Sequence, residues 1–289
     1  MKNIDLNADM GESFGPWKMG NDGALLQVIT SANVACGFHA GDPDVMQQTM
    51  QQAQDCGVGI GAHPGFDDLQ GFGRRRLHLS KTTLQNQIRY QIGAAQAMAR
   101  SVGAEIRHIK LHGALSNMAS EHAELAYDAY EAALSVAPET ILMVLAASAQ
   151  EEVAQSLPCR YVGEIFADRA YNEDATLVDR SIEGAVIHDP ALAADRITEM
   201  VLNGSIITRS GQPIKARIDT ICLHGDTPNA LKIAKSVRRS LEQAGVTLAK
   251  ILPVRLHLRR ENPNATKSGN GICRRAHRHE KPCLVLRNG

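Results

Sequence analysis

The feature that most restricts the fold of this sequence is a regular alternation of short apolar runs with longer helical segments. Seven runs have the length and content of β-strands, at residues 4–8, 29–36, 58–62, 106–111, 141–147, 161–166 and 218–223. Strands that alternate with helices form a parallel sheet with the helices outside it. Seven such units in about 250 residues predict a closed, TIM-like (β/α) barrel. An open doubly wound sheet is the alternative, but no strand is followed by a standard glycine-rich phosphate motif.

The predicted helices have clear starts and ends. Four of them span residues 42–57, 80–103, 189–204 and 227–245, and each begins at Asp, Ser or Thr and closes at Gly. An oxygen-bearing cap, a proline at the first helical position and a glycine past the end are typical helix boundaries. Asp42 and Asp189, which precede prolines, are therefore interpreted as helix caps and not as catalytic acids.

Charge divides the chain into two parts. Residues 250–289 contain ten Lys and Arg but only two acidic residues, Glu261 and Glu280, while the whole chain has a formal net charge of zero. Residues 1–249 are therefore acidic, which argues against nucleic acid as the main partner. We expect a barrel domain at 1–249 and a basic tail at 250–289 that is disordered or an artefact of the reading frame or of a fusion. Zinc binding or nucleic-acid binding by the tail is the less favoured interpretation.

The sequence also indicates a compartment. No apolar run reaches the roughly 18 residues that a membrane helix needs, and residues 1–7 lack the apolar core of a signal peptide. The six cysteines are widely spaced along the chain. Scattered cysteines without an export signal predict free thiols and a cytoplasmic protein that does not associate with membranes.

Charged and imidazole side chains stand at the ends of the predicted strands. They are Asp5, Asn7, Asp9, Glu12, Asn33, His39, His63, Lys110, His112, Asn117, Glu164, Asp168, Arg169, His224 and Asp226. All strand carboxyl ends of a parallel barrel open on one face, so these side chains should converge there. Because several charges in one cleft are costly unless they pair or bind something, the sequence predicts a functional site at this face.

Several chemistries remain open for this site. Asp9, His39 and His63 could supply the nitrogen and oxygen ligands that suit zinc or manganese, although no His-x-x-x-His spacing supports a metal. Lys110 and Arg169 could instead stabilise an oxyanion or a phosphate. Cys36 lies in an apolar run and is better explained as a small core residue than as a nucleophile paired with His39.

Six segments of the chain resemble the LamB/YcsF family, which is also known as the family of 5-oxoprolinase A subunits and of lactam utilization proteins. In order, they are IDLNADMGESFG at 4–15, TSANVACGFHAGDP at 30–43, GIGAHPGFDDLQGFGRR at 59–75, HIKLHGALSN at 108–117, EIFADRAY at 164–171 and ICLHGDTPNA at 221–230. The resemblance covers about residues 3–249 and does not extend into the tail. Leu111 and Ser116 stand where the family usually has Pro and Tyr, and segment 174–180 lacks a usual Gly and Pro.

The resemblance implies a seven-stranded α/β barrel related to polysaccharide deacetylases. It also implies partner subunits B and C, with which the family converts 5-oxoproline, ATP and water to glutamate, ADP and phosphate. ATP would be bound and cleaved by the complex of subunits. The resemblance does not decide whether a divalent metal ion is bound or whether the chain forms a homo-oligomer. The two competing hypotheses are a stand-alone metal-dependent deacetylase or amidohydrolase and a non-catalytic subunit that positions catalytic partners.

Residue roles are inferred from chemistry. We expect one of Asp5, Asp9, His39 or His63 to act as general base on water. Lys110, Arg169 and His224 should hold the developing negative charge or a phosphate. His112 is expected among the catalytic residues, and the remaining strand-end side chains are expected to bind substrate.

Overall fold

The computed structural model describes residues 3–223 and 229–251. The chain divides into two units, Met1–Pro253 and Val254–Gly289, and the described residues all belong to the first. The predicted site residues His224 and Asp226 lie outside the described residues. So does the predicted tail, apart from Lys250 and Ile251.

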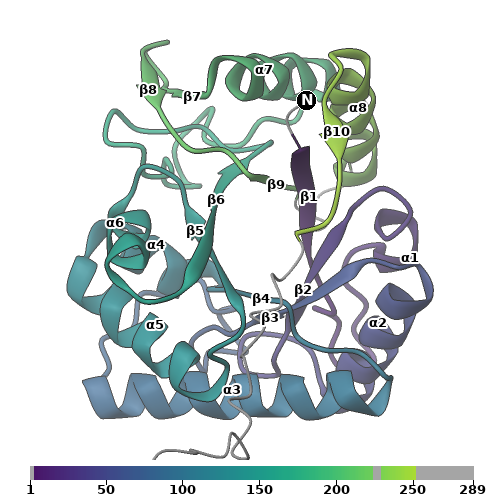
Figure 1. The fold of residues 1–289 in the computed structure, drawn as a ribbon, viewed down its shortest axis with the longest axis vertical. Helices are drawn as coiled ribbons and strands as arrows, with labels where there is room; N and C mark the ends of the chain where they lie inside the picture. The colour runs from purple at the N-terminus through teal and green to yellow at the C-terminus, as the bar shows by residue number, and fades with distance from the viewer. Residues whose placement is uncertain (1–2, 224–228, 252–289) are drawn as a thin grey trace, which may run out of the picture. The chain divides into compact units, whose positions relative to one another are not determined.

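Seven parallel strands close into a barrel, which confirms the predicted fold class (Figure 1). They are β1 (Asn3–Met10), β2 (Ser31–Ala35), β3 (Gly59–His63), β4 (His108–Lys110), β5 (Ile141–Leu145), β6 (Arg160–Phe166) and β9 (Thr220–Cys222). Each strand pairs with the next, and β9 pairs with both β6 and β1, which closes the ring. A short strand, β10 (Thr247–Leu248), pairs in parallel with the start of β1.

The helices lie around the outside of the barrel (Figure 1). They are α1 (Asp22–Leu25), α2 (Pro43–Asp55), α3 (Lys81–Ser101), α4 (Gly113–Glu121), α5 (Ala123–Val136), α6 (Ala149–Ser156), α7 (Pro190–Asn203) and α8 (Ala230–Gln243). Asp42, Ser80 and Asp189 accept hydrogen bonds from the first backbone N–H groups of α2, α3 and α7, which confirms the predicted caps. Helix α8 begins at Ala230 with Asn229 as its N-cap, later than predicted.

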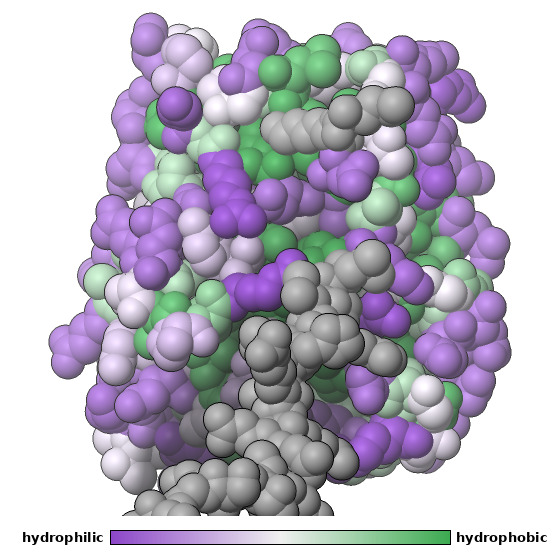
Figure 2. All heavy atoms as spheres, viewed as in Figure 1, coloured by the Kyte–Doolittle hydropathy of each residue, from purple (hydrophilic) through white to green (hydrophobic). Residues whose placement is uncertain are grey.

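Two short strands late in the chain were not among the predicted ones. Strands β7 (Ser205–Ile207) and β8 (Pro213–Lys215) form an antiparallel pair between α7 and β9. Their three-residue length is too short to give a clear periodicity in the sequence. Figure 2 shows hydrophilic side chains along most of the edge of this face, with hydrophobic and strongly hydrophilic residues next to one another in its middle. Within the described part of the chain, no helix has both the length and the apolar character needed to cross a membrane.

The two faces of β1 explain how the barrel positions a site. Leu6, Ala8 and Met10 are fully buried in the main apolar core, which includes residues of the surrounding helices. The alternate residues Asp5 and Asn7 are buried too, but they make hydrogen bonds to side chains of neighbouring strands. Because successive side chains of a strand point to opposite faces, one strand supplies both the core under the helices and a polar barrel interior.

Gly163 in β6 is a close-contact position with a large expected effect on stability. A Cβ atom added there would lie 2.1 Å from the backbone oxygen of Arg217, which cannot move aside as a flexible side chain could. We expect Gly163→Ala to lower the free energy of unfolding by about 3 kcal/mol. Gly93→Ala in α3 is the matched control, because a Cβ there meets none of the described atoms within 4 Å. It should stabilise the helix by up to about 1 kcal/mol. Equal urea midpoints for the two variants would contradict this contact.

Candidate functional site

The lowest polar layer of the barrel interior is built around Asp5. Its carboxylate accepts hydrogen bonds from the hydroxyl groups of Thr30 at 2.7 Å, Ser31 at 2.6 Å and Thr220 at 2.6 Å. Burial raises the pKa of Asp5, and the three hydroxyl groups act in the opposite direction. Both oxygens of Asp5 are therefore engaged inside the barrel, which indicates a structural role for this predicted candidate base.

The next layer is a network of amides. Asn7 donates to Thr220 at 2.8 Å and accepts from Asn33 at 2.7 Å. The side-chain oxygen of Asn33 accepts from Nε2 of His108 at 2.7 Å, so His108 belongs to the barrel interior and not to the surface. Burial lowers the pKa of His108 to about 3, and the nearby charge of Lys110 acts in the same direction. This layer fixes the side chains that support the mouth of the barrel.

Lys110 occupies the centre of the upper layer. Its ammonium lies 2.9 Å from Asp9 Oδ1, 2.9 Å from Glu164 Oε1 and 3.0 Å from Cys222 Sγ. Burial alone would lower the pKa of Lys110, but its neighbours, chiefly the carboxylates of Asp9 and Glu164, raise it well above its usual value. Burial raises the pKa of Cys222, which is therefore a neutral thiol. Lys110 is therefore a buried cation shared by two carboxylates that come from β1 and β6.

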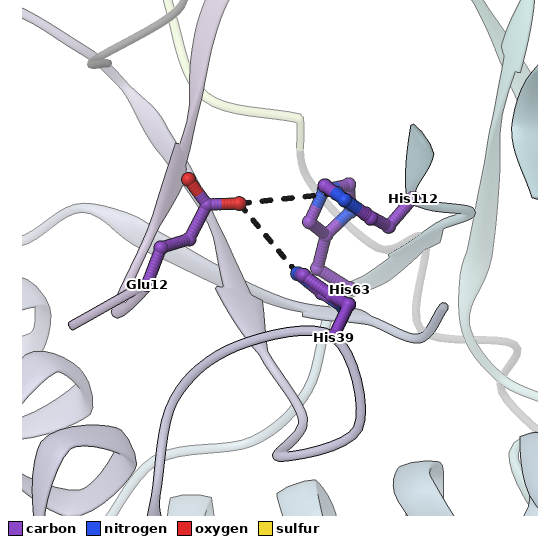
Figure 3. Close-up of side chains that lie close together, drawn as sticks. All are labelled: Glu12, His39, His63 and His112. Atoms are coloured by element: carbon purple, nitrogen blue, oxygen red, sulfur yellow. Dashed lines mark hydrogen bonds and ion pairs between the residues drawn. The ribbon is translucent and has the colours of Figure 1, made fainter. Parts of the chain in front are cut away.

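Three imidazoles and one carboxylate gather beside this layer (Figure 3). One ligand atom from each of Glu12, His39, His63 and His112 lies within 4.8 Å of the others. The rings of His39 and His112 are stacked, with centroids 3.6 Å apart and planes inclined by 5°. The His63 ring stands nearly perpendicular to both of these rings. Glu12 Oε1 is 3.5 Å from His39 Nε2 and 3.8 Å from His112 Nδ1. We call these four residues the histidine cluster.

The hydrogen bonds of two imidazoles fix their tautomers. His63 Nδ1 donates to the backbone oxygen of Lys110 at 2.8 Å, and His112 Nε2 donates to that of Phe72 at 2.8 Å. The other two nitrogens, His63 Nε2 and His112 Nδ1, face each other at 3.0 Å. In neutral imidazoles both of these atoms carry a lone pair, so a proton or another cation is needed between them.

His39 completes the case for a cation. Among the described residues, neither ring nitrogen of His39 has a hydrogen-bond partner, although the side chain is fully buried. Burial, followed by the neighbouring imidazoles, lowers the pKa of His39 and of His112 well below the usual value. Neutral imidazoles with inward lone pairs, together with one carboxylate, form a donor set that suits zinc or a similar divalent ion.

A tight turn holds the histidine cluster in place. Phe72 and Gly73 both have positive φ angles, of 54° and 60°. A Cβ on Gly73 would lie 2.7 Å from His39 and 2.8 Å from His112, so only glycine allows this approach. The Phe72 ring packs edge-on against both stacked imidazoles. The turn at residues 71–75 therefore covers the histidine cluster with its backbone and with the ring of Phe72.

The donor set of the histidine cluster differs in part from the candidate metal ligands named from the sequence. His39 and His63 belong to the histidine cluster as expected, but Glu12 and His112 complete it where Asp9 was expected. Asp9 Oδ2 lies 3.3 Å from His63 Nε2, while its other oxygen is bound to Lys110. Glu12 and His112 had been expected to contact substrate and to act in catalysis, and nothing in their spacing marked them as ligands.

A pocket of about 610 Å³ opens over the histidine cluster and Lys110. Of the residues predicted for the site, seven line it: Asp9, Glu12, His63, Lys110, His112, Asn117 and Arg169. The other described candidates do not line it: Asp5, Asn7, Asn33, His39, Glu164 and Asp168. Arg74, Arg76 and Arg180 also line the pocket and were not among the predicted site residues. The sequence alone did not mark these arginines as site residues, because arginines in loops usually face solvent.

The comparisons with known proteins agree with the resemblance read from the sequence. The model of the LamB/YcsF family matches residues 4–255. The chain is 61% identical over 248 residues to the 5-oxoprolinase A subunit of Ruegeria pomeroyi, covering 86% of this chain and 98% of that one. It is 48% identical over 250 residues to the protein of that name from Rhodopseudomonas palustris strain BisA53, with the same coverage. The crystal structure of a lactam utilization protein from Thermus thermophilus matches with a TM-score of 0.81 and 41% identity, covering 87% of this chain and 100% of that one.

Proposed function

The chain belongs to the LamB/YcsF family, and from this membership we propose that it is the A subunit of an ATP-dependent 5-oxoprolinase. The reaction opens the lactam ring of 5-oxo-L-proline to give L-glutamate, with cleavage of ATP to ADP and phosphate. Relatives that share this name match over 86% of the chain and nearly their whole length. The proposal therefore concerns the entire barrel and not a fragment of it.

One observation about the site supports this chemistry most directly. Two carboxylates line the same pocket: Asp9, which is paired with buried Lys110, and Glu12, which lies among three imidazoles. Opening an amide needs a base that activates water and cationic groups that stabilise the oxyanion formed at the carbonyl. Both kinds of group face the same pocket, whose volume suits a small cyclic substrate.

Asp9 is the residue best placed to accept a proton from water. It lines the pocket, Lys110 and Asn33 both donate to its Oδ1, and its Oδ2 faces His63. These donors orient the carboxylate while its second oxygen remains directed toward the histidine cluster.

The histidine cluster can hold a divalent metal ion within the same proposal. Glu12, His39, His63 and His112 would hold it, as their convergent and neutral donor atoms indicate. Such an ion, when bound, would polarise a carbonyl or lower the pKa of a bound water. Phe72 and Gly73 keep bulk water from two of the imidazoles.

The remaining parts of the proposal concern partners and compartment. We expect subunits B and C to supply ATP binding and to activate the lactam, because the described part of this chain contains no standard glycine-rich phosphate-binding motif. The cysteines in the same part of the chain, Cys36, Cys56, Cys159 and Cys222, are free. Free thiols fit a reducing compartment and support a cytoplasmic location.

The direct test measures glutamate release from 5-oxo-L-proline by this chain, alone and together with candidate B and C subunits, with and without ATP. We expect glutamate only when all three subunits and ATP are present. A mixture that makes no glutamate, although the same B and C work with the A subunit of another species, would refute the proposal.

The second candidate is a stand-alone metal-dependent amidohydrolase, which the histidine cluster favours. It predicts amide hydrolysis by this chain alone, without ATP, and complete inhibition by a chelator. The ATP-free arm of the same experiment separates the two candidates.

A further inference from the structure

Five cationic side chains line the pocket: Arg74, Arg76, Lys110, Arg169 and Arg180. We call three of them, Arg74, Arg169 and Arg180, the arginine cluster. It brings together the turn that covers the histidines, the segment that follows β6, and the loop before α7.

Arg169 is the member whose environment points to a ligand. Its side chain is 4% exposed, and its Nη2 donates to the backbone oxygen of Val178 at 2.6 Å. Its Nε–H is buried and has no hydrogen-bond partner in the described part of the chain. A buried guanidinium donor without an acceptor is costly, and an anion in the pocket would remove that cost.

The other two arginines place further positive charge near Arg169. Burial lowers the pKa of Arg169 to about 10. The positive charge of Arg180 and, less strongly, that of Arg74 act in the same direction, while the carboxylate of Asp168 opposes them. Two carboxylates that line the pocket, Asp174 and Asp179, accept hydrogen bonds within their own loop, from Thr176 and Ser181 respectively.

We propose that Arg74, Arg169 and Arg180 form an oxyanion subsite that anchors an anionic group of the reacting molecule. This inference rests on the proposed function only for the identity of that molecule. Two sources share the chemistry: the carboxylate of 5-oxo-L-proline, or a phosphate group transferred from ATP in the coupled reaction. Guanidinium groups suit either one, because their paired N–H donors match carboxylate and phosphate oxygens. The subsite would hold one end of the ring while its carbonyl faces Lys110 and the histidine cluster.

The test uses calorimetric titration of the full chain with three probes. These are 5-oxo-L-proline, inorganic phosphate, and pyrrolidin-2-one, which is the same lactam without the carboxylate. Arg169→Gln is the main variant. Arg180→Gln, at a less buried position, gives the same readout should the first variant fail to fold, as judged by circular dichroism. Arg100→Gln, at the exposed end of α3, removes an arginine outside the pocket and is the matched control.

We expect both cluster variants to bind an anionic probe about tenfold or more weakly, while pyrrolidin-2-one binds to all variants equally. Weakened binding of 5-oxo-L-proline alone identifies the carboxylate as the occupant, and weakened binding of phosphate alone identifies the phosphate. The proposal is overturned if neither anion binds the wild-type chain, or if the folded variants bind both anions as the wild type does. If the wild-type chain makes glutamate with subunits B and C, but the arginine variants bind both anions normally, the subsite is refuted and the proposed function stands. If the wild-type mixture makes no glutamate, but the variants bind phosphate more weakly than the wild type, the proposed function is refuted and the subsite stands.

Discussion

Replacing Lys110 with Met is expected to lower the free energy of unfolding by about 3–5 kcal/mol, because it leaves two carboxylates buried together without their cation. Asp9 and Glu164 both lie 2.9 Å from the Lys110 ammonium, and Glu164 is 3% exposed. The same change should abolish glutamate formation by the assembled complex, since Asp9 would lose its cationic partner and one of the two donors that orient it. Urea unfolding measures the first effect, and the coupled assay described above measures the second.

Lys81→Met provides a matched control for this prediction. Lys81 also pairs closely with an acid, Asp128 at 2.6 Å, but its side chain is 57% exposed. Exposed ion pairs contribute little, so this variant should unfold almost as the wild type does. Adding Glu164→Gln to Lys110→Met should recover part of the lost stability, because it removes one of the two unpaired charges. Equal losses in Lys110→Met and Lys81→Met would contradict a buried charge network at the barrel mouth.

Loss of the histidine cluster is also expected to have a large effect on activity. We expect the purified chain, after equilibration with zinc or manganese, to retain about one divalent ion. Glu12→Gln and His39→Ala should each reduce metal retention and lower turnover of the assembled complex by at least about 100-fold. His39 contributes a fully buried neutral imidazole, and Glu12 contributes the one carboxylate of the cluster. Elemental mass spectrometry after dialysis measures retention independently of activity.

The control for the metal prediction is His122→Ala. Its imidazole is 62% exposed and lies outside the cluster, so both metal content and turnover should remain at the wild-type level. Treatment with a chelator should reproduce the loss seen in the cluster variants, and added metal should reverse it in the wild type only. A wild-type chain that retains no metal, with full turnover in chelator, would show that the imidazoles serve another purpose.

The seven barrel strands and the boundaries of α2, α3 and α7 were predictable from the sequence because they depend on neighbours along the chain. The seven predicted strands correspond to β1–β6 and β9, and the caps at Asp42, Ser80 and Asp189 are present. Where the local signal was weak, the prediction was incomplete: the antiparallel pair β7–β8 was missed, and α8 starts later than predicted.

The site was predictable as a region but not as an arrangement. Asp5 and Asp9 are on the same face of one strand and looked equivalent in the sequence. In the barrel, Asp5 is held by three hydroxyl groups in the lowest layer, whereas Asp9 reaches the pocket beside Lys110 and His63. Glu12 lies beyond the end of β1, so its proximity to three histidines depends on how the chain turns after the strand.

The sequence by itself determined that this chain forms a parallel barrel and that its polar strand ends face one opening. Those properties follow from local periodicity, capping and the two-residue repeat of a strand. The tertiary structure alone decided which donors meet: His112 faces His63, Glu12 completes the histidine cluster, and Arg169 lines the same pocket as Arg74 and Arg180. The physical reason is that a distance between side chains on different strands depends on barrel closure and strand register, which no local pattern encodes.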